Sequence, residues 1–404
     1  MNNTKLFITG TSRSGTNLVA YMLSANKNIH VAPDCLMEIL RLQRNLVLNK
    51  IDKKKYSFKF TSKLPFEDYY YSDESIKKLD LISNSSTNLK ITRDIWKKHF
   101  NIIKKRISLE NKDLAKHVSK VYNPSFLKLI NNWFEVIKTV RHLKEKKIIG
   151  SVDPWTTEMF LPLVKSFKNS KFIVIIRDPR ASIASHISMK HKHKYRIANL
   201  LSYIKCWRKM IALTIYYKSL KIFKNRLHVV VHEELVKNPK KVCKKLCNFL
   251  NVQFESKMLD TRNYIDYSTG KIWPGNSNFE KKAFGFSKKR ISRWKKILSY
   301  SQIKAIEFIA FHELKLLNYK LYKKDSFSEL KNGLSSLIGD EKKKKKWGAS
   351  TKKTEFIYGV EFFRNYLFDV NSIGKDKNLL RRLFLFKEAY SKIRKKKSIL
   401  KSII

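Results

Sequence analysis

One segment near the start of the chain carries the residue types of a phosphate-binding loop. It reads Lys5-Leu-Phe-Ile-Thr-Gly-Thr-Ser-Arg-Ser-Gly-Thr-Asn-Leu-Val-Ala-Tyr-Met-Leu23. The apolar residues 6–8 predict a strand, two glycines separated by four residues bound a loop, and apolar residues at helical spacing follow. A strand, a glycine loop and a helix in this order direct backbone N–H groups and the positive end of the helix at an anion.

The loop differs from that of a nucleotide triphosphatase. In those enzymes the second glycine is followed by Lys and then Ser or Thr, which bind the terminal phosphates and Mg²⁺. Here Thr16 and Asn17 occupy these positions, and Arg13 is the cation of the loop. We therefore expect an anion that needs no metal, which argues against ATP hydrolysis and favours a phosphosulfate. A glycine-rich turn without a ligand is the alternative that this segment alone leaves open.

A second candidate for anion binding is Lys171-Phe-Ile-Val-Ile-Ile-Arg-Asp-Pro-Arg-Ala-Ser-Ile-Ala-Ser-His-Ile187. The continuous apolar run 172–176 is typical of a strand that is buried on both faces. Asp178, just before a proline, predicts the N-cap of a helix. Arg177 could bind a phosphate through two hydrogen bonds, and the Ser185 hydroxyl could donate to the same group. A surface ion pair beside an ordinary capped helix explains the segment equally well.

Together the two segments resemble the sulfotransferases that use 3′-phosphoadenosine-5′-phosphosulfate (PAPS), especially the branch that contains the tyrosylprotein and many bacterial sulfotransferases. The resemblance implies that the Arg-Ser-Gly-Thr loop holds the 5′-phosphosulfate. It also implies that the arginine at the end of the second strand, with the serine eight residues later, holds the 3′-phosphate. The cofactor-binding positions implied by these two segments are Arg13, Ser14, Gly15, Thr16, Asn17, Arg177 and Ser185.

Two later segments resemble the same family. Residues 229–239, Val-Val-Val-His-Glu-Glu-Leu-Val-Lys-Asn-Pro, are similar to its strand-to-helix stretch, with His232 in the place of a tyrosine. The resemblance implies that His232 also binds the cofactor. Residues 273–279, Trp-Pro-Gly-Asn-Ser-Asn-Phe, are similar to the cofactor-covering loop of bacterial members. The residues of that loop implied in cofactor binding are Asn276 and Ser277. The four motifs occur in the expected order, and the resemblance spans about residues 4–320.

Sulfuryl transfer depends mostly on positioning and on neutralising charge at the transferring group, which the resemblance assigns to Arg13 and the loop amides. A base must also take the proton of the acceptor. Counting from Arg13 without gaps, the glutamate base of the tyrosylprotein branch falls on Asp34. Glu38, one helical turn later, is the reserve candidate. Asp34 could instead be the N-cap of the helical stretch that follows it.

One departure bears on catalysis. The tyrosylprotein branch has a lysine, thought to stabilise the leaving phosphate, where Val152 stands here. We expect a PAPS-dependent sulfotransferase whose acceptor is a hydroxyl on a carbohydrate or another small metabolite, with a protein tyrosine as a further candidate. Val152 motivates the alternative of a catalytically weakened member of the family that still binds the nucleotide.

The net charge is the third feature that bears on function. The 404 residues carry a formal net charge of +53, with a pI of about 10.1. Such a balance favours acidic partners, among them an anionic acceptor. A basic nucleic-acid-binding protein is the rival class. We find no zinc-ligand spacing and no basic recognition helix, and the lysines are spread along the chain apart from the run 342–346. We therefore expect no specific nucleic acid.

The four cysteines do not suggest a disulfide framework in a chain of this length. Cys243 and Cys247 lie on the apolar stripe of a predicted helix, which favours core packing over metal binding. The first predicted strand begins near the N-terminus, and no apolar run approaches transmembrane length. We expect a soluble, cytoplasmic protein.

The organisation predicted from these patterns is an α/β, three-layer, P-loop-like fold with a central parallel sheet. Residues 1–324 form the predicted sulfotransferase domain, in which 36–148 is a mainly helical insertion on the acceptor side. Residues 325–404 form a basic, helical C-terminal extension. Its amphipathic helices could contact an anionic membrane surface or a partner; folding back on their own domain is the alternative.

Overall fold

A computed structural model describes most of the chain, and two compact units are distinguished in it. The described ranges are 3–51, 67–85, 89–189, 197–275, 285–323, 329–330, 332, 350–370, 373 and 376–395. Unit 1 comprises Met1–Glu67, Lys78–Ile176 and Leu220–Ser287. Unit 2 comprises Asp68–Lys77, Arg177–Ser219 and Lys288–Ile404.

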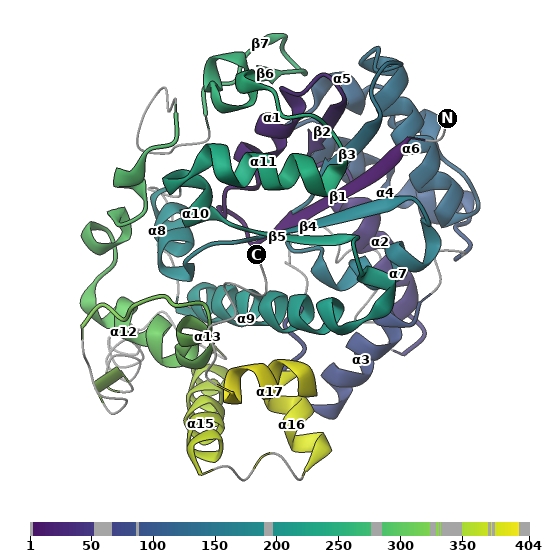
Figure 1. The fold of residues 1–404 in the computed structure, drawn as a ribbon. Coiled ribbons are helices and arrows are strands. Elements are labelled where there is room, and N and C mark those ends of the chain that lie inside the picture. Colours follow the sequence, from purple (N-terminus) through teal and green to yellow (C-terminus); the bar gives the residue numbers. More distant parts are fainter. Residues whose placement is uncertain are drawn as a thin grey trace. The chain divides into compact units, whose positions relative to one another are not determined.

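Unit 1 is built on a five-stranded sheet whose strands all run parallel in the order β2-β3-β1-β4-β5 (Figure 1). The strands are β1 (Thr4–Gly10), β2 (Ile29–Pro33), β3 (Ile148–Val152), β4 (Ser170–Ile176) and β5 (Leu227–Val231). The central parallel sheet is therefore confirmed, as are the strands predicted at 6–8 and 172–176. The short strand β2 was not predicted.

Alternating side chains of β1 divide the core of unit 1 into two faces. Leu6 and Ile8 pack into one apolar cluster with residues of α1 (Thr16–Ser24) and α11 (Pro239–Leu250). On the other face the ring of Phe7 meets that of Phe134 in α6 (Phe126–Val140), with the centroids 5.6 Å apart. Helices therefore cover both faces of the sheet, which confirms the three-layer arrangement.

The remaining elements described in unit 1 are helices and one hairpin. The α-helices are α2 (Met37–Leu48), α4 (Arg93–Ile107), α5 (Lys112–Ala115), α7 (Phe160–Ser166) and α10 (His232–Lys237), while α3 (Asp73–Ser83) begins in unit 2. The 3-10 helices are η2 (Val118–Val121), η3 (Thr157–Met159), η4 (Lys221–Phe223), η5 (Ser256–Leu259) and η6 (Thr261–Asn263). The antiparallel hairpin is formed by β6 (Ile265–Asp266) and β7 (Lys271–Ile272). The stretch predicted to be mainly helical contains α2 to α6.

The cysteine pair of α11 lies in the core of unit 1. Cys243 and Cys247 are 0% and 1% exposed, and their sulfur atoms lie 3.8 and 3.7 Å from Sδ of Met258. Core packing, as predicted, is what the structure shows for both cysteines.

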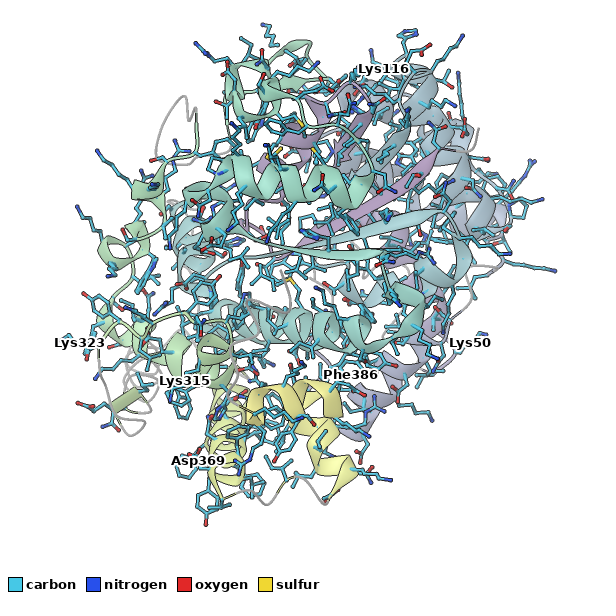
Figure 2. The ribbon with its side chains drawn as sticks, viewed as in Figure 1. Lys50, Lys116, Lys315, Lys323, Asp369 and Phe386 are labelled. Carbon is cyan, nitrogen blue, oxygen red and sulfur yellow. The ribbon has the colours of Figure 1, made fainter. Side chains whose placement is uncertain are left out.

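Unit 2 is helical in the part that the structure describes. Its α-helices are α8 (Pro179–Met189), α9 (Ile197–Ser219), α12 (Tyr300–Ile309), α13 (Phe311–Leu316), α15 (Ser350–Asp369), α16 (Lys377–Phe384) and α17 (Lys387–Arg394), with 3-10 helices η7 (Lys288–Arg290) and η8 (Arg293–Lys296). Phe386, labelled in Figure 2, joins α16 to α17 and stacks on Tyr216 of α9 with the ring centroids 4.3 Å apart. Described residues of the C-terminal stretch therefore fold back onto an earlier helix of their own unit, which is the alternative considered above.

A buried ion-pair network ties three helices of unit 2 together. Arg208 of α9 pairs with Glu361 of α15 and, at 3.5 Å, with Glu313 of α13. Arg364 of α15 pairs with Glu313 as well, and the Tyr71 hydroxyl donates to Glu361. Arg208, Glu361 and Arg364 are 0% exposed. Charges removed from water in this way persist only when each has an opposite charge beside it.

We predict that Glu361→Ala lowers the free energy of unfolding of the full chain by about 3–5 kcal/mol, because the buried Arg208 then keeps only Glu313 as counter-charge, at 3.5 Å and shared with Arg364. Denaturant unfolding would measure the loss.

The matched control is Asp369→Ala on the same helix. Asp369 is exposed (Figure 2) and its loss should change stability by no more than about 0.5 kcal/mol. Equal effects of the two substitutions would contradict the stabilising role of the network.

Candidate active site

The glycine loop between β1 and α1 leaves no room for a side chain at either glycine. A Cβ atom at Gly10 would lie 2.4 Å from Oγ of Ser14 and 2.8 Å from the carbonyl oxygen of Ile175. Gly15 has a φ of 93°, in the left-handed region, and a Cβ there would lie 2.3 Å from Nδ1 of His232. The loop is thus packed against β4 and against the first residue of α10, and only glycine fits both positions.

Buried hydroxyl groups of this loop suit an anion. Oγ of Ser14 and Oγ1 of Thr11 are buried and have no hydrogen-bond partner among the described residues. A buried hydroxyl without a partner costs free energy, so a bound group that accepts hydrogen bonds would satisfy both. Ser14 was predicted as a ligand of the phosphosulfate; Thr11 was not. The donors of the loop therefore fit a phosphate or sulfate group.

Three residues other than glycine adopt left-handed conformations in the loops that follow three neighbouring strands. They are Arg13 after β1, Asp34 after β2 and Trp155 after β3, with φ values of 67°, 51° and 69°. Such conformations cost on the order of 1–3 kcal/mol each and persist where the surroundings enforce them, which is common at functional sites. The loops are bonded to the neighbouring strands: Asp34 N donates to the Val152 carbonyl at 2.7 Å, and Trp155 N donates to that of Gly10 at 2.9 Å.

Asp34 forms an ion pair rather than a helix cap. Its Oδ2 lies 2.9 Å from Nη2 of Arg106 in α4, and its buried Oδ1 has no hydrogen-bond partner among the described residues. The following helix, α2, begins at Met37 and is capped by Asp153, whose Oδ1 accepts from the backbone N–H groups of Leu36 and Met37 at 2.8 and 2.7 Å. The alternative interpretation of Asp34 as an N-cap is therefore wrong, because a carboxylate from the adjacent strand end takes that place.

Glu38, the reserve candidate for the base, pairs within its own helix. Its Oε1 lies 2.9 Å from Nη1 of Arg41, and both side chains are buried. Burial raises the pKa of Glu38, and the Arg41 charge opposes that shift. The neighbouring guanidinium makes Glu38 less available for proton transfer.

Burial raises the pKa of several carboxyl groups around Asp34. It raises the pKa of Asp34 itself, although the Arg106 guanidinium opposes this shift. Burial, together with the negative charge of Asp34, raises the pKa of Asp153 and of Glu110 to about 7. The carboxyl of Glu110 also experiences the positive charges of Arg106 and Arg13. Carboxyl groups that hold a proton near neutral pH are suited to proton transfer.

Sequence analysis missed Arg106, Glu110 and Asp153. Arg106 and Glu110 lie more than seventy residues after Asp34, in and after a helix whose pattern is that of an ordinary amphipathic surface helix. Asp153 follows Val152 and precedes a proline. Its place in this Asp-Pro pair was the one sequence feature that could have indicated a role for Asp153.

The second predicted anion-binding segment is described within unit 2. Asp178 is the N-cap of α8, as predicted: its Oδ1 accepts from the backbone N–H of Arg180 at 2.9 Å. The Arg180 side chain pairs with Asp178 and with Glu307 of α12. Nε1 of Trp207 donates to the carbonyl oxygen of Arg177 at 2.9 Å, which holds the backbone of that residue. The roles predicted for Arg177 and Ser185 remain predictions.

Two other expectations concern positions in or near unit 1. Asn276 and Ser277 lie outside the described residues. Val152 is 0% exposed and belongs to the apolar cluster under α1 and α11, so its side chain is part of the core. Near the start of the predicted covering loop, Trp273 stacks on Tyr21 of α1 with the ring centroids 4.4 Å apart.

Comparison with protein families gives the assignment. The model of the sulfotransferase family matches residues 5–256, more than half of the chain. The chain belongs to the sulfotransferase family. The match includes the glycine loop, Asp34 and the segment that begins at Lys171.

Curated relatives of this sulfotransferase-family chain include three protein-tyrosine sulfotransferases. That of Drosophila melanogaster is 31% identical over 120 residues, which cover 29% of this chain and 24% of that protein. Protein-tyrosine sulfotransferase 2 of Gallus gallus is 31% identical over 130 residues, which cover 31% of this chain and 34% of that protein. Protein-tyrosine sulfotransferase 1 of Danio rerio is 32% identical over 136 residues, which cover 32% of this chain and 37% of that protein. The chain thus matches between about a quarter and a little over a third of the length of these relatives.

Solved structures with detectable similarity include two sulfotransferase domains. The domain from the Synechococcus PCC 7002 olefin synthase has a TM-score of 0.43 at 16% identity and covers 74% of this chain and 90% of that chain. The domain from the curacin biosynthetic pathway has a TM-score of 0.43 at 18% identity and covers 80% of this chain and 99% of that chain.

The described part of this sulfotransferase-family chain contains neither a metal-binding cluster nor a membrane-spanning helix. Among the described residues, no group of three or more His, Cys, Asp and Glu side chains is arranged to hold a metal ion. Within the same ranges, no helix combines the length and apolar character needed to cross a bilayer.

We predict that Asp153 makes stability fall as pH rises. Burial raises its pKa from 3.8 to about 7, so the folded chain holds this proton more tightly than the unfolded chain. The resulting stabilisation is complete below pH about 4 and is lost as pH increases through about 7. Asp153→Asn keeps an oxygen for the N–H groups of Leu36 and Met37 but cannot titrate.

Thermal unfolding of the wild type and of Asp153→Asn between pH 4 and 8 would measure the difference. The wild type should lose stability relative to the variant as the pH increases. Parallel stability curves would contradict the raised pKa.

Proposed function

We propose that this protein transfers a sulfuryl group from PAPS to a hydroxyl of a carbohydrate or another small metabolite, with a protein tyrosine as a further candidate acceptor. The observation that carries the proposal is the glycine loop. Its glycines admit no side chain, Arg13 is held in a left-handed conformation, and the buried hydroxyls of Ser14 and Thr11 have no hydrogen-bond partner among the described residues. Family membership supports the same reaction class.

The residues present fit such a donor. PAPS would supply a sulfuryl group on a phosphate leaving group. The backbone N–H groups at the start of α1, the Arg13 guanidinium and the two buried hydroxyls would bind the phosphosulfate end and neutralise its charge. For Arg177 and Ser185, contact with the 3′-phosphate is the role that the resemblance predicts. These contacts use arginine, hydroxyl and amide donors and require no metal ion.

We assign the base to Asp34. Its Oδ1 is buried and has no hydrogen-bond partner among the described residues. Its Oδ2 pairs with Arg106, and this ion pair orients the carboxyl group. Oδ1 would accept the proton of the acceptor hydroxyl, and Arg106 would hold the carboxyl in place. Burial raises the pKa of Asp34, which makes it a stronger base than an exposed carboxylate. Glu110, with a pKa of about 7, is a second candidate in the same cluster.

A catalytically weakened, nucleotide-binding member of the family is the second candidate function. Val152 motivates it, because a buried valine takes the position of a lysine thought to stabilise the leaving phosphate. The two functions differ in turnover and agree in nucleotide binding, so binding and transfer must be measured separately.

We predict that adenosine 3′,5′-bisphosphate binds without Mg²⁺ and more tightly than AMP. Arg177→Ala should weaken its binding by about 1.5–3 kcal/mol, since the variant loses a charge-assisted hydrogen bond to the 3′-phosphate. Isothermal titration calorimetry of both nucleotides would measure the effect.

A conservative control is Arg177→Lys, which keeps the charge and loses the planar fork, and should recover part of the affinity. Equal affinities of the wild type for AMP and for the bisphosphate would remove the assignment of the 3′-phosphate site.

We predict that Asp34→Asn lowers turnover by about 10²-fold or more, the range expected when a general base is lost. Affinity for the bisphosphate should stay unchanged, because the proposed role of Asp34 concerns the acceptor. Sulfuryl transfer from PAPS to a panel of hydroxyl acceptors would be compared with nucleotide binding by the same samples.

Glu110→Gln and Glu38→Gln are the matched controls. If Asp34→Asn turns over like the wild type while one of these variants is slow, the base is the other carboxyl. If none of the three changes turnover, general-base catalysis by this cluster is excluded.

A further inference from the structure

Helix α15 differs from an ordinary surface helix because it buries charged residues and exposes aromatic ones. Three polar residues of the helix, Glu361, Arg364 and Asn365, are 0% exposed. They belong to or border the ion-pair network with Arg208 and Glu313 described above. Surface helices usually bury an apolar stripe and expose charged residues. Here the charged side chains, together with the buried ring of Phe368, anchor the helix to its own unit.

The opposite face of α15 exposes aromatic side chains. Phe356, Phe363 and Tyr366 are 58%, 47% and 55% exposed, and Val370 just after the helix is 51% exposed. Their spacing of seven, three and four residues places them in one stripe along the helix. Phe362, 41% exposed, borders the stripe. We refer to Phe356, Phe363, Tyr366 and Val370 as the aromatic stripe.

An exposed stripe of this kind is unusual in a protein that remains alone in water, because contiguous apolar patches mark interaction sites. A second copy of this chain is a poor occupant, since each copy carries a formal charge of +53 and the two would repel. An occupant with negative charge is favoured. One lysine run, 342–346, precedes α15 in the sequence, and a second, 395–397, follows α17.

We propose that the aromatic stripe of α15 docks on an anionic lipid surface. Helices that lie in the bilayer interface combine Phe, Tyr or Trp on the face that enters the headgroup region with Lys and Arg nearby, which attract anionic lipids. The aromatic stripe supplies the first component and the basic chain the second. The buried network keeps the stripe facing outward, so binding requires no unfolding of the helix. The membrane would be bound at its surface, since no helix of the described residues is long and apolar enough to cross it.

The test is flotation of the full chain with vesicles of phosphatidylcholine alone and of phosphatidylcholine mixed with phosphatidylserine. The wild type should float with the mixed vesicles only, and added salt should release it. The triple variant Phe356→Ser, Phe363→Ser, Tyr366→Ser should bind the mixed vesicles at least about tenfold more weakly, because it loses three aromatic side chains that enter the interface.

The matched control is the double variant Leu109→Ser, Ile222→Ser, which removes exposed apolar side chains (63% and 38% exposed) elsewhere and should float like the wild type. Circular dichroism of all variants verifies folding, and light scattering reports their mass. Binding of the triple variant equal to that of the wild type would assign any lipid attraction to the lysines alone and overturn the proposal. The proposal is also overturned if the wild-type protein stays in the soluble fraction, whether light scattering shows a monomer or an assembly formed through the aromatic stripe.

Discussion

The candidate site depends on the absence of a side chain at two positions of one loop. At Gly10 a methyl group would overlap Ser14 and the backbone of β4, and at Gly15 it would overlap the ring of His232. The polypeptide can therefore turn directly from β1, the central strand, into α1. The backbone N–H groups at the start of α1 then point out beyond the carboxyl edge of the sheet, where anions bind in open parallel sheets. A larger residue at either position would push the loop off the strand and displace Arg13.

The removal of charge from water has two outcomes in this molecule. In unit 1 burial raises the pKa values of Asp34, Glu110 and Asp153, although Arg106 and Arg41 oppose the shift at Asp34, and Arg106 and Arg13 oppose it at Glu110. In unit 2 two buried arginines face two buried glutamates, and the charges remain paired. The first arrangement places exchangeable protons near a predicted site of transfer. The second fixes helices and orients α15 with its aromatic residues outward.

Local patterns predicted much of the fold. The apolar run 172–176 and the Asp-Pro pair after Arg177 specify a buried strand and a capped helix, because both signals act between residues a few positions apart. Strand β2 gave no comparable signal: it has five residues, includes a histidine and ends at a proline. Its place at the edge of the sheet comes from pairing with β3, more than one hundred residues later.

The sequence by itself determined the glycine loop, the strand-and-helix alternation of a parallel sheet and the family to which the chain belongs, since these depend on residue types at short, regular spacing. Only the tertiary structure decided what the carboxyl groups do. Asp34 precedes a helix as a cap would, yet Asp153 caps that helix and Asp34 pairs with Arg106. The reason is that a capping bond and an ion pair compete for the same oxygen atoms, and the outcome depends on which distant groups the fold brings within about 3 Å.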